Sequence, residues 1–358
     1  MTPDPITDLC AFLRGESTDF PVGDEGDRLL GLANTHRVEH LLAWRLPHLQ
    51  ILDLRREALV DGLRVRELNR VLAALERVDA SPVVFKGAAL AHTHYVESWH
   101  RPRIDADVVI APASRSRAFE ALRELGYEGI PFVSGDLVMY QAPFVWTDDF
   151  GIEHAVDLHW HVSNRQVVAH VLTHSELADR ATTASALGYV MRVPSPVDAL
   201  ILACVHRAAH HDDAESLIWL YDIHLIAGRL DSHEWETLVH RASGRGVAAL
   251  CARGLQLSSR RFDTRIPSEI IGRLGPGRGR PREASALFLR KDLRPVDRLL
   301  GDLRALGLRD AAHLVREHLF PSREYIDTKY ALRSRALLPA YYAFRAVAGA
   351  SKWFRRVD

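Results

Sequence analysis

Residues 104–110 constrain the fold of this chain more than any other stretch, because two carboxylates alternate there with apolar residues. Successive side chains of a β-strand point to opposite faces, so Asp105 and Asp107 share one face of the predicted strand. The residues expected to face the core are Ile104, Ala106 and Val108. Two adjacent carboxylates repel each other, and Mg²⁺ binds a few carboxylate oxygens together with substrate phosphates. The pattern therefore predicts a divalent-cation site on a strand.

A third carboxylate, Asp157, lies in a second predicted strand, between Val156 and Leu158. A carboxylate from a neighbouring strand, placed beside the Asp105/Asp107 pair, can hold two metal ions for an in-line phosphoryl or nucleotidyl displacement. We therefore predict that all three aspartates are catalytic and bind metal, with two Mg²⁺ ions as the cofactor and Mn²⁺ as a substitute.

The stretch upstream of the aspartates has the features of a phosphate-binding turn. The apolar run 83–85 ends at Lys86 and Gly87. A glycine lets the backbone approach a triphosphate closely, and the lysine can reach its oxygens. The chain has four lysines among its 46 lysine and arginine residues, so a lysine before this glycine is informative.

These motifs resemble the uncharacterised bacterial nucleotidyltransferase family of the DNA polymerase β superfamily. The pattern is K-G-x-x-L, then R-P-x-x-D-x-D, then D-L-H-W, with a looser resemblance over residues 36–46 and in the helical region after the core. The matching residues are Lys86, Gly87, Leu90, Arg101, Pro102, Asp105, Asp107, Asp157, His159 and Trp160. One departure is Ala88, since the superfamily usually has Gly-Ser or Gly-Gly at this turn.

The resemblance implies an α+β fold: a polymerase-β-like core of a small mixed sheet with helices, flanked by N- and C-terminal helical regions. The predicted divisions are a helical lobe 1–80, the core 81–195, a helical domain 196–320 and a basic aromatic tail 321–358. The predicted helices are 52–78, 88–96, 114–125, 170–181, 197–228, 232–258 and 284–320. The predicted strands are 83–85, 104–110, an antiparallel pair within 132–144 and 151–162, and 188–193. Residues 272–283 are predicted to be a mobile loop, and Ser195 is predicted to cap the helix that follows it.

Four further residues are candidates for nucleotide binding. Arg101 matches the family pattern and would steady the aspartates or a phosphate, the alternative being a solvated arginine. His159 shares the strand face of Asp157, where it would orient that carboxylate, contact substrate or pack in the core. His206 and His210 are spaced i, i+4 on a helix. This spacing occurs in zinc sites, but the resemblance favours contact with nucleotide or acceptor, and a solvated face is the third reading.

Composition narrows the class of protein. The hydrophobic content of 47% is that of an ordinary globular protein. The formal net charge is zero, which argues against a dedicated nucleic-acid binder. The tail 322–358 nevertheless carries eight Lys or Arg against three Asp or Glu, and it mixes aromatic residues with arginines. The three cysteines are far apart and read as buried thiols rather than a disulfide framework. Neither a secretion signal nor a membrane span is recognisable, so we expect a cytoplasmic protein.

The sequence thus predicts a metal-dependent nucleotidyltransferase that moves an NMP from an NTP to an acceptor hydroxyl on a small molecule, a peptide or a protein. Two alternatives stay open: a toxin-like nucleotidyltransferase that modifies tRNA, and a non-catalytic scaffold that kept the fold. The motifs of P-loop, dinucleotide-binding and α/β-hydrolase chemistry do not occur in the sequence.

Overall fold

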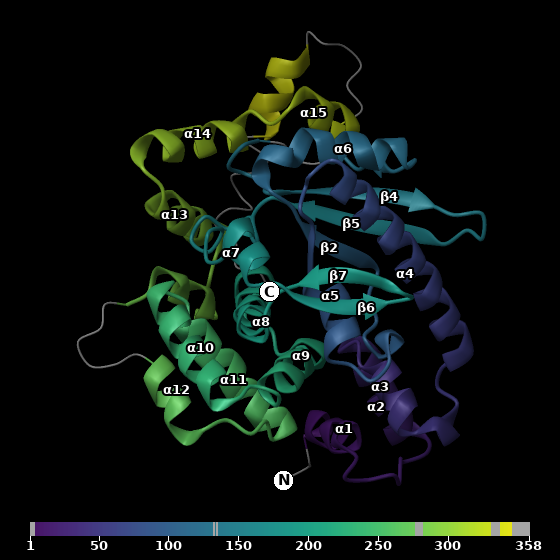
Figure 1. The fold of residues 1–358 in the computed structure, drawn as a ribbon. Helices are drawn as coiled ribbons and strands as arrows, with labels where there is room; N and C mark the ends of the chain where they lie inside the picture. Colours follow the sequence, from purple (N-terminus) through teal and green to yellow (C-terminus); the bar gives the residue numbers. More distant parts are fainter. Residues whose placement is uncertain (1–3, 132, 134, 276–281, 331–336, 346–358) are drawn as a thin grey trace.

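The computed structural model describes residues 4–131, 133, 135–275, 282–330 and 337–345 (Figure 1). Its centre is a five-stranded sheet in the order β1-β2-β5-β4-β3, and β6 and β7 form a separate hairpin. The strands are β1 (Val83–Phe85), β2 (Asp105–Val109), β3 (Glu128–Gly129), β4 (Gln141–Thr147), β5 (Glu153–His159), β6 (Thr182–Ala186) and β7 (Tyr189–Val193). β2 and β5 are parallel, while the other neighbouring strands are antiparallel. The sheet is therefore mixed, as predicted.

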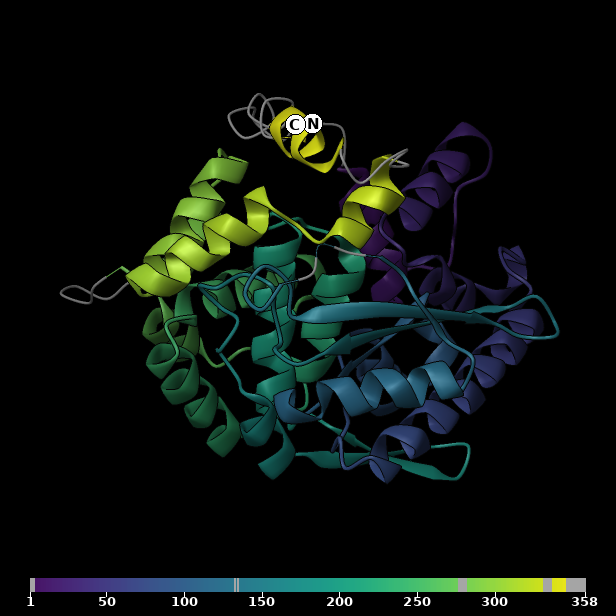
Figure 2. The ribbon, with the colours of Figure 1, turned by 90° about the horizontal axis from the view of Figure 1, so that it is seen from above.

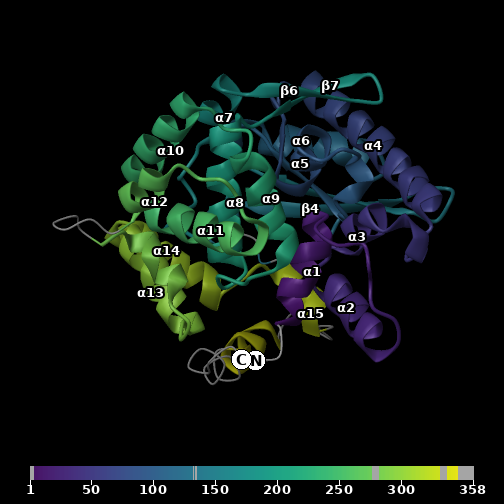
Figure 3. The same cartoon turned by 90° about the horizontal axis from the view of Figure 1, so that it is seen from below.

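Fifteen α-helices surround the sheet in the described part of the chain. They are α1 (Pro5–Arg14), α2 (Asp24–Thr35), α3 (Glu39–Arg45), α4 (Leu54–Arg77), α5 (Lys86–Thr93), α6 (Arg115–Glu124), α7 (His174–Asp179), α8 (Pro196–His210), α9 (Leu217–Ala227), α10 (Ser232–Gly244), α11 (Ala248–Phe262), α12 (Ser268–Leu274), α13 (Pro295–Ala305), α14 (Leu308–Leu319) and α15 (Arg323–Tyr330). Helices α8–α12 gather on one side of the molecule, and the sheet with α4 and α6 lies on the other (Figures 1 and 3).

One face of the sheet packs against α4 and α6 (Figure 2). The strands supply alternate residues to this core, including Val84, Val108 and Leu158, and α4 supplies Leu68 and Leu72. These side chains are all almost fully buried. Because strand side chains alternate, the polar residues of β2 and β5 must project from the opposite face, toward α5 and α8.

A second apolar core joins helices that lie far apart in the sequence. Side chains of α1–α3 are buried in the same cluster as those of α8–α12, together with Val83, Phe85 and Val109 of the sheet. Arg14 in α1 donates a hydrogen bond to the carbonyl of Arg261 in α11, 2.7 Å away. The N-terminal helices and the C-terminal helical region therefore share one apolar interior. The domain boundaries proposed from the sequence stay a prediction.

Two helical glycines give a stability prediction. A Cβ on Gly254 of α11 would lie 2.7 Å from Cys204 Sγ and 3.1 Å from Ile223 Cδ1, whereas a Cβ on Gly62 of α4 would meet nothing within 4 Å. We expect Gly62→Ala to stabilise the protein by about 0.5–1 kcal/mol, because alanine is the better helix former. Gly254→Ala should lose this gain to overpacking, which costs about 1–3 kcal/mol. Thermal unfolding of the two variants would measure the difference, and equal shifts would contradict close packing of α11 on α8 and α9.

Most of the predicted elements are confirmed. The strand 83–85 has the bounds of β1, the strand at 104–110 is β2, and the antiparallel pair is β4 and β5. Ser195 accepts the backbone N–H of Asp198 and caps α8. The three cysteines are buried and free.

Several predictions about the fold were wrong. Ile104 does not face the core: it precedes β2 and its exposed fraction is 71%. The helix expected over 197–228 is two helices, because residues 211–216 form a turn between α8 and α9. The helices expected over 232–258 and 284–320 are likewise divided, the first into α10 and α11, the second into a 3-10 helix (Ala284–Leu289), α13 and α14. Strand β6, which pairs with β7, was not predicted. The loop and tail predictions lie largely outside the described residues, at 276–281, 331–336 and 346–358.

Candidate active site

The strand register places the predicted aspartates together. Asp107 of β2 is the direct partner of Asp157 on the parallel strand β5, and on its other side Asp107 is the partner of Phe85 at the end of β1. Asp105 is the first residue of β2 and shares the strand face of Asp107. The three carboxylates thus project from two neighbouring interior strands, on the face of the sheet that α4 and α6 leave uncovered.

Asp107 is the most strongly held of the three. Its Oδ1 accepts hydrogen bonds from Lys86 Nζ at 2.6 Å and from His159 Nε2 at 2.9 Å. Burial alone would raise the pKa of Asp107, but the Lys86 charge and the His159 hydrogen bond hold that pKa well below its usual range. Burial lowers the pKa of His159 to about 4, so its ring is neutral at pH 7 and donates through Nε2.

Asp157 is a partly buried carboxylate whose negative charge is compensated less than that of Asp107. Burial, then the charges of Asp107 and Asp105, raise its pKa to about 6, against the opposing charge of Lys86. One Asp157 oxygen accepts a hydrogen bond from Gln141 Nε2 at 3.0 Å. Burial and Asp107 also raise the pKa of Asp105. The site therefore concentrates more negative charge than Lys86 neutralises.

This donor set fits a divalent cation. Ligand atoms of Asp107, Asp157 and His159 all lie within 4.8 Å of one another. Mutually repelling carboxylates with raised pKa values are relieved by a cation, and their hard oxygen atoms suit Mg²⁺ or Mn²⁺. This group of three contains His159, whereas Asp105 was predicted from the sequence to be the third ligand. Asp105 lines the cavity in front of this group, and its role as a ligand stays a prediction.

A cavity of about 350 Å³ opens in front of the carboxylates. Its far wall is formed by α8 and α9, which contribute His206, His210, His211 and Trp219. His206 and His210 stack with ring centroids 5.5 Å apart, and His211 stacks on Trp219 at 4.0 Å. Burial lowers the pKa of His206, and lowers that of His210 to about 3, so both rings are neutral at pH 7. They offer stacking surface and neutral hydrogen-bonding groups rather than charge; their contact with nucleotide stays a prediction.

Arg101 and Gly87 lie against each other at the side of the cavity. The Arg101 guanidinium donates to both carboxylate oxygens of Asp222 in α9, at 2.9 Å for its closest contacts, and Asp222 also accepts from the Tyr95 hydroxyl at 2.7 Å. A Cβ on Gly87 would lie 3.5 Å from Arg101 Cζ. Both residues line the cavity. Arg101 is thus occupied by a buried ion pair that joins the core to α9, and its binding of nucleotide stays a prediction.

The residues that line the cavity and were not singled out from the sequence include Arg37, Gln141, His211 and Trp219. Gln141 carried a weak signal, as a polar residue in a stretch predicted to be a strand. Arg37 lies in the stretch 36–46 that resembles the family. His211 and Trp219 gave no signal, because the turn that brings them together was read as continuous helix.

A mixed sheet with acidic residues at its parallel junction, a lysine on the preceding turn and flanking helical regions defines a nucleotidyltransferase core. The sequence model of the uncharacterised nucleotidyltransferase family matches residues 23–263, from the start of α2 to the end of α11. This is about two-thirds of the chain, and the chain belongs to that family. A comparison with curated proteins found no match. None of the described helices is long and apolar enough to cross a membrane; a cytoplasmic location stays a prediction.

Proposed function

We propose that the protein transfers an NMP from an NTP to an acceptor hydroxyl in the cavity between the sheet and α8. The observation that carries the proposal is the convergence of Asp105, Asp107 and Asp157 on that cavity, with Lys86 beside them. Family membership supports an NTP as the donor substrate. A divalent cation held by the carboxylates would supply neutralisation of the triphosphate charge.

The chain's own residues would position the reactants. Lys86 lies where it can exchange its contact with Asp107 for a phosphate oxygen, since its ammonium group is a flexible point charge. Asp157, with its raised pKa and its hydrogen bond from Gln141, would take up the proton of the acceptor hydroxyl. The hydroxyl oxygen then bonds to the α-phosphorus, the bond from that phosphorus to the bridging oxygen breaks, and pyrophosphate leaves.

Other features of the cavity support a bound aromatic ring. The neutral stacked pairs His206–His210 and His211–Trp219 give one wall an aromatic surface, which suits a nucleobase or an aromatic acceptor. A small molecule, a peptide or a protein side chain remains our proposal for the acceptor.

A direct test is calorimetric titration of ATP, GTP, CTP and UTP into the protein with and without Mg²⁺. We expect at least one of the four to bind, and the binding to disappear when EDTA removes the metal, because the carboxylates repel an uncompensated triphosphate. The selected nucleotide would identify the base. Equal binding with and without metal would contradict the assignment of the carboxylates.

A further inference from the structure

Arg37 enters the cavity from a part of the chain distant from the catalytic strands. It lies in the turn between α2 and α3, is partly buried and lines the same cavity as Asp105 and Asp107. Its positive charge acts to lower the pKa of Asp105 on the sheet and the pKa of His211 just after α8. The N-terminal helices therefore contribute a charged group to the proposed active site.

The other cations that line the cavity already have partners. Lys86 pairs with Asp107, Arg101 with Asp222, and Arg103 with Asp61 at 2.7 Å. Arg37 makes no side-chain hydrogen bond or ion pair with the residues that the structure describes. Its guanidinium keeps all of its donors available to a ligand, which makes it the readiest anion-binding group on the cavity wall.

The backbone at Arg37 is left-handed, with φ at 58°. Among the lysines and arginines of the described ranges, Lys86 shares this feature, with φ at 52°. A residue with a Cβ is strained in this region, and such strain persists where the surrounding structure enforces it, often at functional sites. The two left-handed cations both line the cavity that contains the carboxylates.

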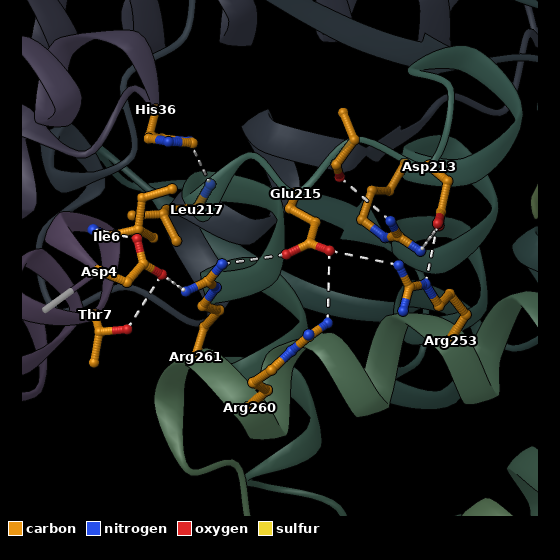
Figure 4. A network of polar contacts seen from close by, with 12 residues as sticks. Asp4, Ile6, Thr7, His36, Asp213, Glu215, Leu217, Arg253, Arg260 and Arg261 are labelled. Atoms are coloured by element: carbon orange, nitrogen blue, oxygen red, sulfur yellow. Dashed lines mark hydrogen bonds and ion pairs between the residues drawn. The ribbon is translucent and has the colours of Figure 1, made fainter. Parts of the chain in front are cut away.

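Neighbouring contacts hold the Arg37 turn in place. The N–H of Leu217 donates to His36 Nδ1 at 3.4 Å (Figure 4). The N–H of Ile218 donates to the His36 carbonyl at 3.3 Å. These two bonds attach the turn to the first residues of α9, one of the helices that form the cavity wall. Arg37 is thus presented by a fixed turn rather than by a loose loop.

We propose that Arg37 binds the β- and γ-phosphates of the nucleotide, together with Lys86. The inference rests on the proposed function and assigns to this arginine the part of the donor that leaves as pyrophosphate. An arginine fork matches phosphate oxygens and forms charge-assisted hydrogen bonds with them. With Arg101 and Arg103 occupied, Lys86 alone would otherwise face the triphosphate.

Inorganic pyrophosphate with Mg²⁺ is the suitable probe, because it does not depend on the identity of the base. Titration calorimetry would compare the wild type with Arg37→Gln, Arg37→Gly and the control Arg28→Gln. Arg28 is an exposed arginine of α2 that lies outside the cavity. We expect both Arg37 variants to bind pyrophosphate about 10- to 100-fold more weakly and the control to bind as the wild type does. Arg37→Gly should unfold at the same temperature or higher, since glycine accepts a positive φ.

The outcomes separate this inference from the proposed function. Wild-type binding of pyrophosphate that survives in both Arg37 variants would overturn the role of Arg37 and leave the nucleotidyltransferase proposal standing. A wild type that binds neither pyrophosphate nor any NTP with Mg²⁺ would overturn both. Weaker binding accompanied by a lower unfolding temperature in Arg37→Gly would show a structural arginine and would also overturn the inference.

Discussion

Replacing Asp105 and Asp107 together by alanine should lower nucleotidyl transfer by roughly 10³-fold or more and abolish Mg²⁺-dependent NTP binding. Asp107 accepts hydrogen bonds from both Lys86 and His159, so its loss removes the carboxylate that orients these two side chains. The fold should survive. Asp105 has a pKa raised by burial and by Asp107, so its charge opposes folding at neutral pH, and its removal relieves that opposition.

The raised pKa of Asp157 determines how its contribution to the stability of the fold changes with pH. Its folded pKa of about 6 lies above the ordinary aspartate value of 3.8, so the folded state favours the protonated carboxyl. This contribution is present at low pH and is lost as the pH rises through about 6. Removing the neighbouring charge of Asp105 should make that loss smaller, because Asp105 is one of the groups that raise the Asp157 pKa.

The matched control is Asp149→Ala, which removes an exposed carboxylate from the turn between β4 and β5. Calorimetry of Mg²⁺-NTP binding and circular dichroism of all variants would be the measurements. The control should keep full binding. Binding by the double variant at wild-type strength, with a normal circular dichroism spectrum, would refute the catalytic assignment of both aspartates.

Breaking the ion pair between Arg101 and Asp222 should have the largest effect on stability. Both side chains are buried, and Asp222 holds Arg101 through two oxygens. Replacing Arg101 by methionine leaves a buried carboxylate whose remaining partner is the Tyr95 hydroxyl. Removing one partner of a buried ion pair costs about 3–5 kcal/mol, so Arg101→Met should lower the free energy of unfolding by about that amount.

Denaturant unfolding would measure this loss, and the double variant Arg101→Met/Asp222→Leu supplies the comparison. It buries no unpaired charge, so it should recover most of the stability. If Arg101→Met unfolds like the wild type but binds Mg²⁺-NTP weakly, the ion pair is not the main role of Arg101. Arg101 would then bind the nucleotide, as the family pattern implied.

The strands that carry the three aspartates, β2 and β5, were predictable because their signal is local. Alternation of Asp105 and Asp107 with apolar residues determines which side chains share a face, and in β5 more exposed and fully buried side chains alternate from Glu153 to Leu158. The same alternation predicted that His159, two residues after Asp157, lies on the strand face of that aspartate. The mixed sheet itself required the family resemblance, since periodicity does not give strand order.

The rest of the cavity depends on contacts between distant segments. Arg37 lines the cavity beside the carboxylates because the neighbouring His36 is hydrogen-bonded to Leu217, which is 181 residues away. The segment before β4 is held by Glu317 of α14, which accepts the backbone N–H groups of Asp136, Leu137 and Val138. No local pattern encodes such pairings, so Arg37 and Gln141 could not be placed from the sequence.

The shared core of α1–α3 with α8–α12 has a consequence for synthesis on the ribosome. Roughly 200 residues separate Arg45, the last residue of α3, from Ala248, the first of α11. At about 5–20 residues per second, the ribosome needs roughly 10–40 s to synthesise the residues between them. During this interval the apolar faces of α1–α3 have emerged without the helices that cover them. The nascent chain thus offers chaperones a binding surface early, and the arginine of the α2–α3 turn reaches its final position only after α9 is made.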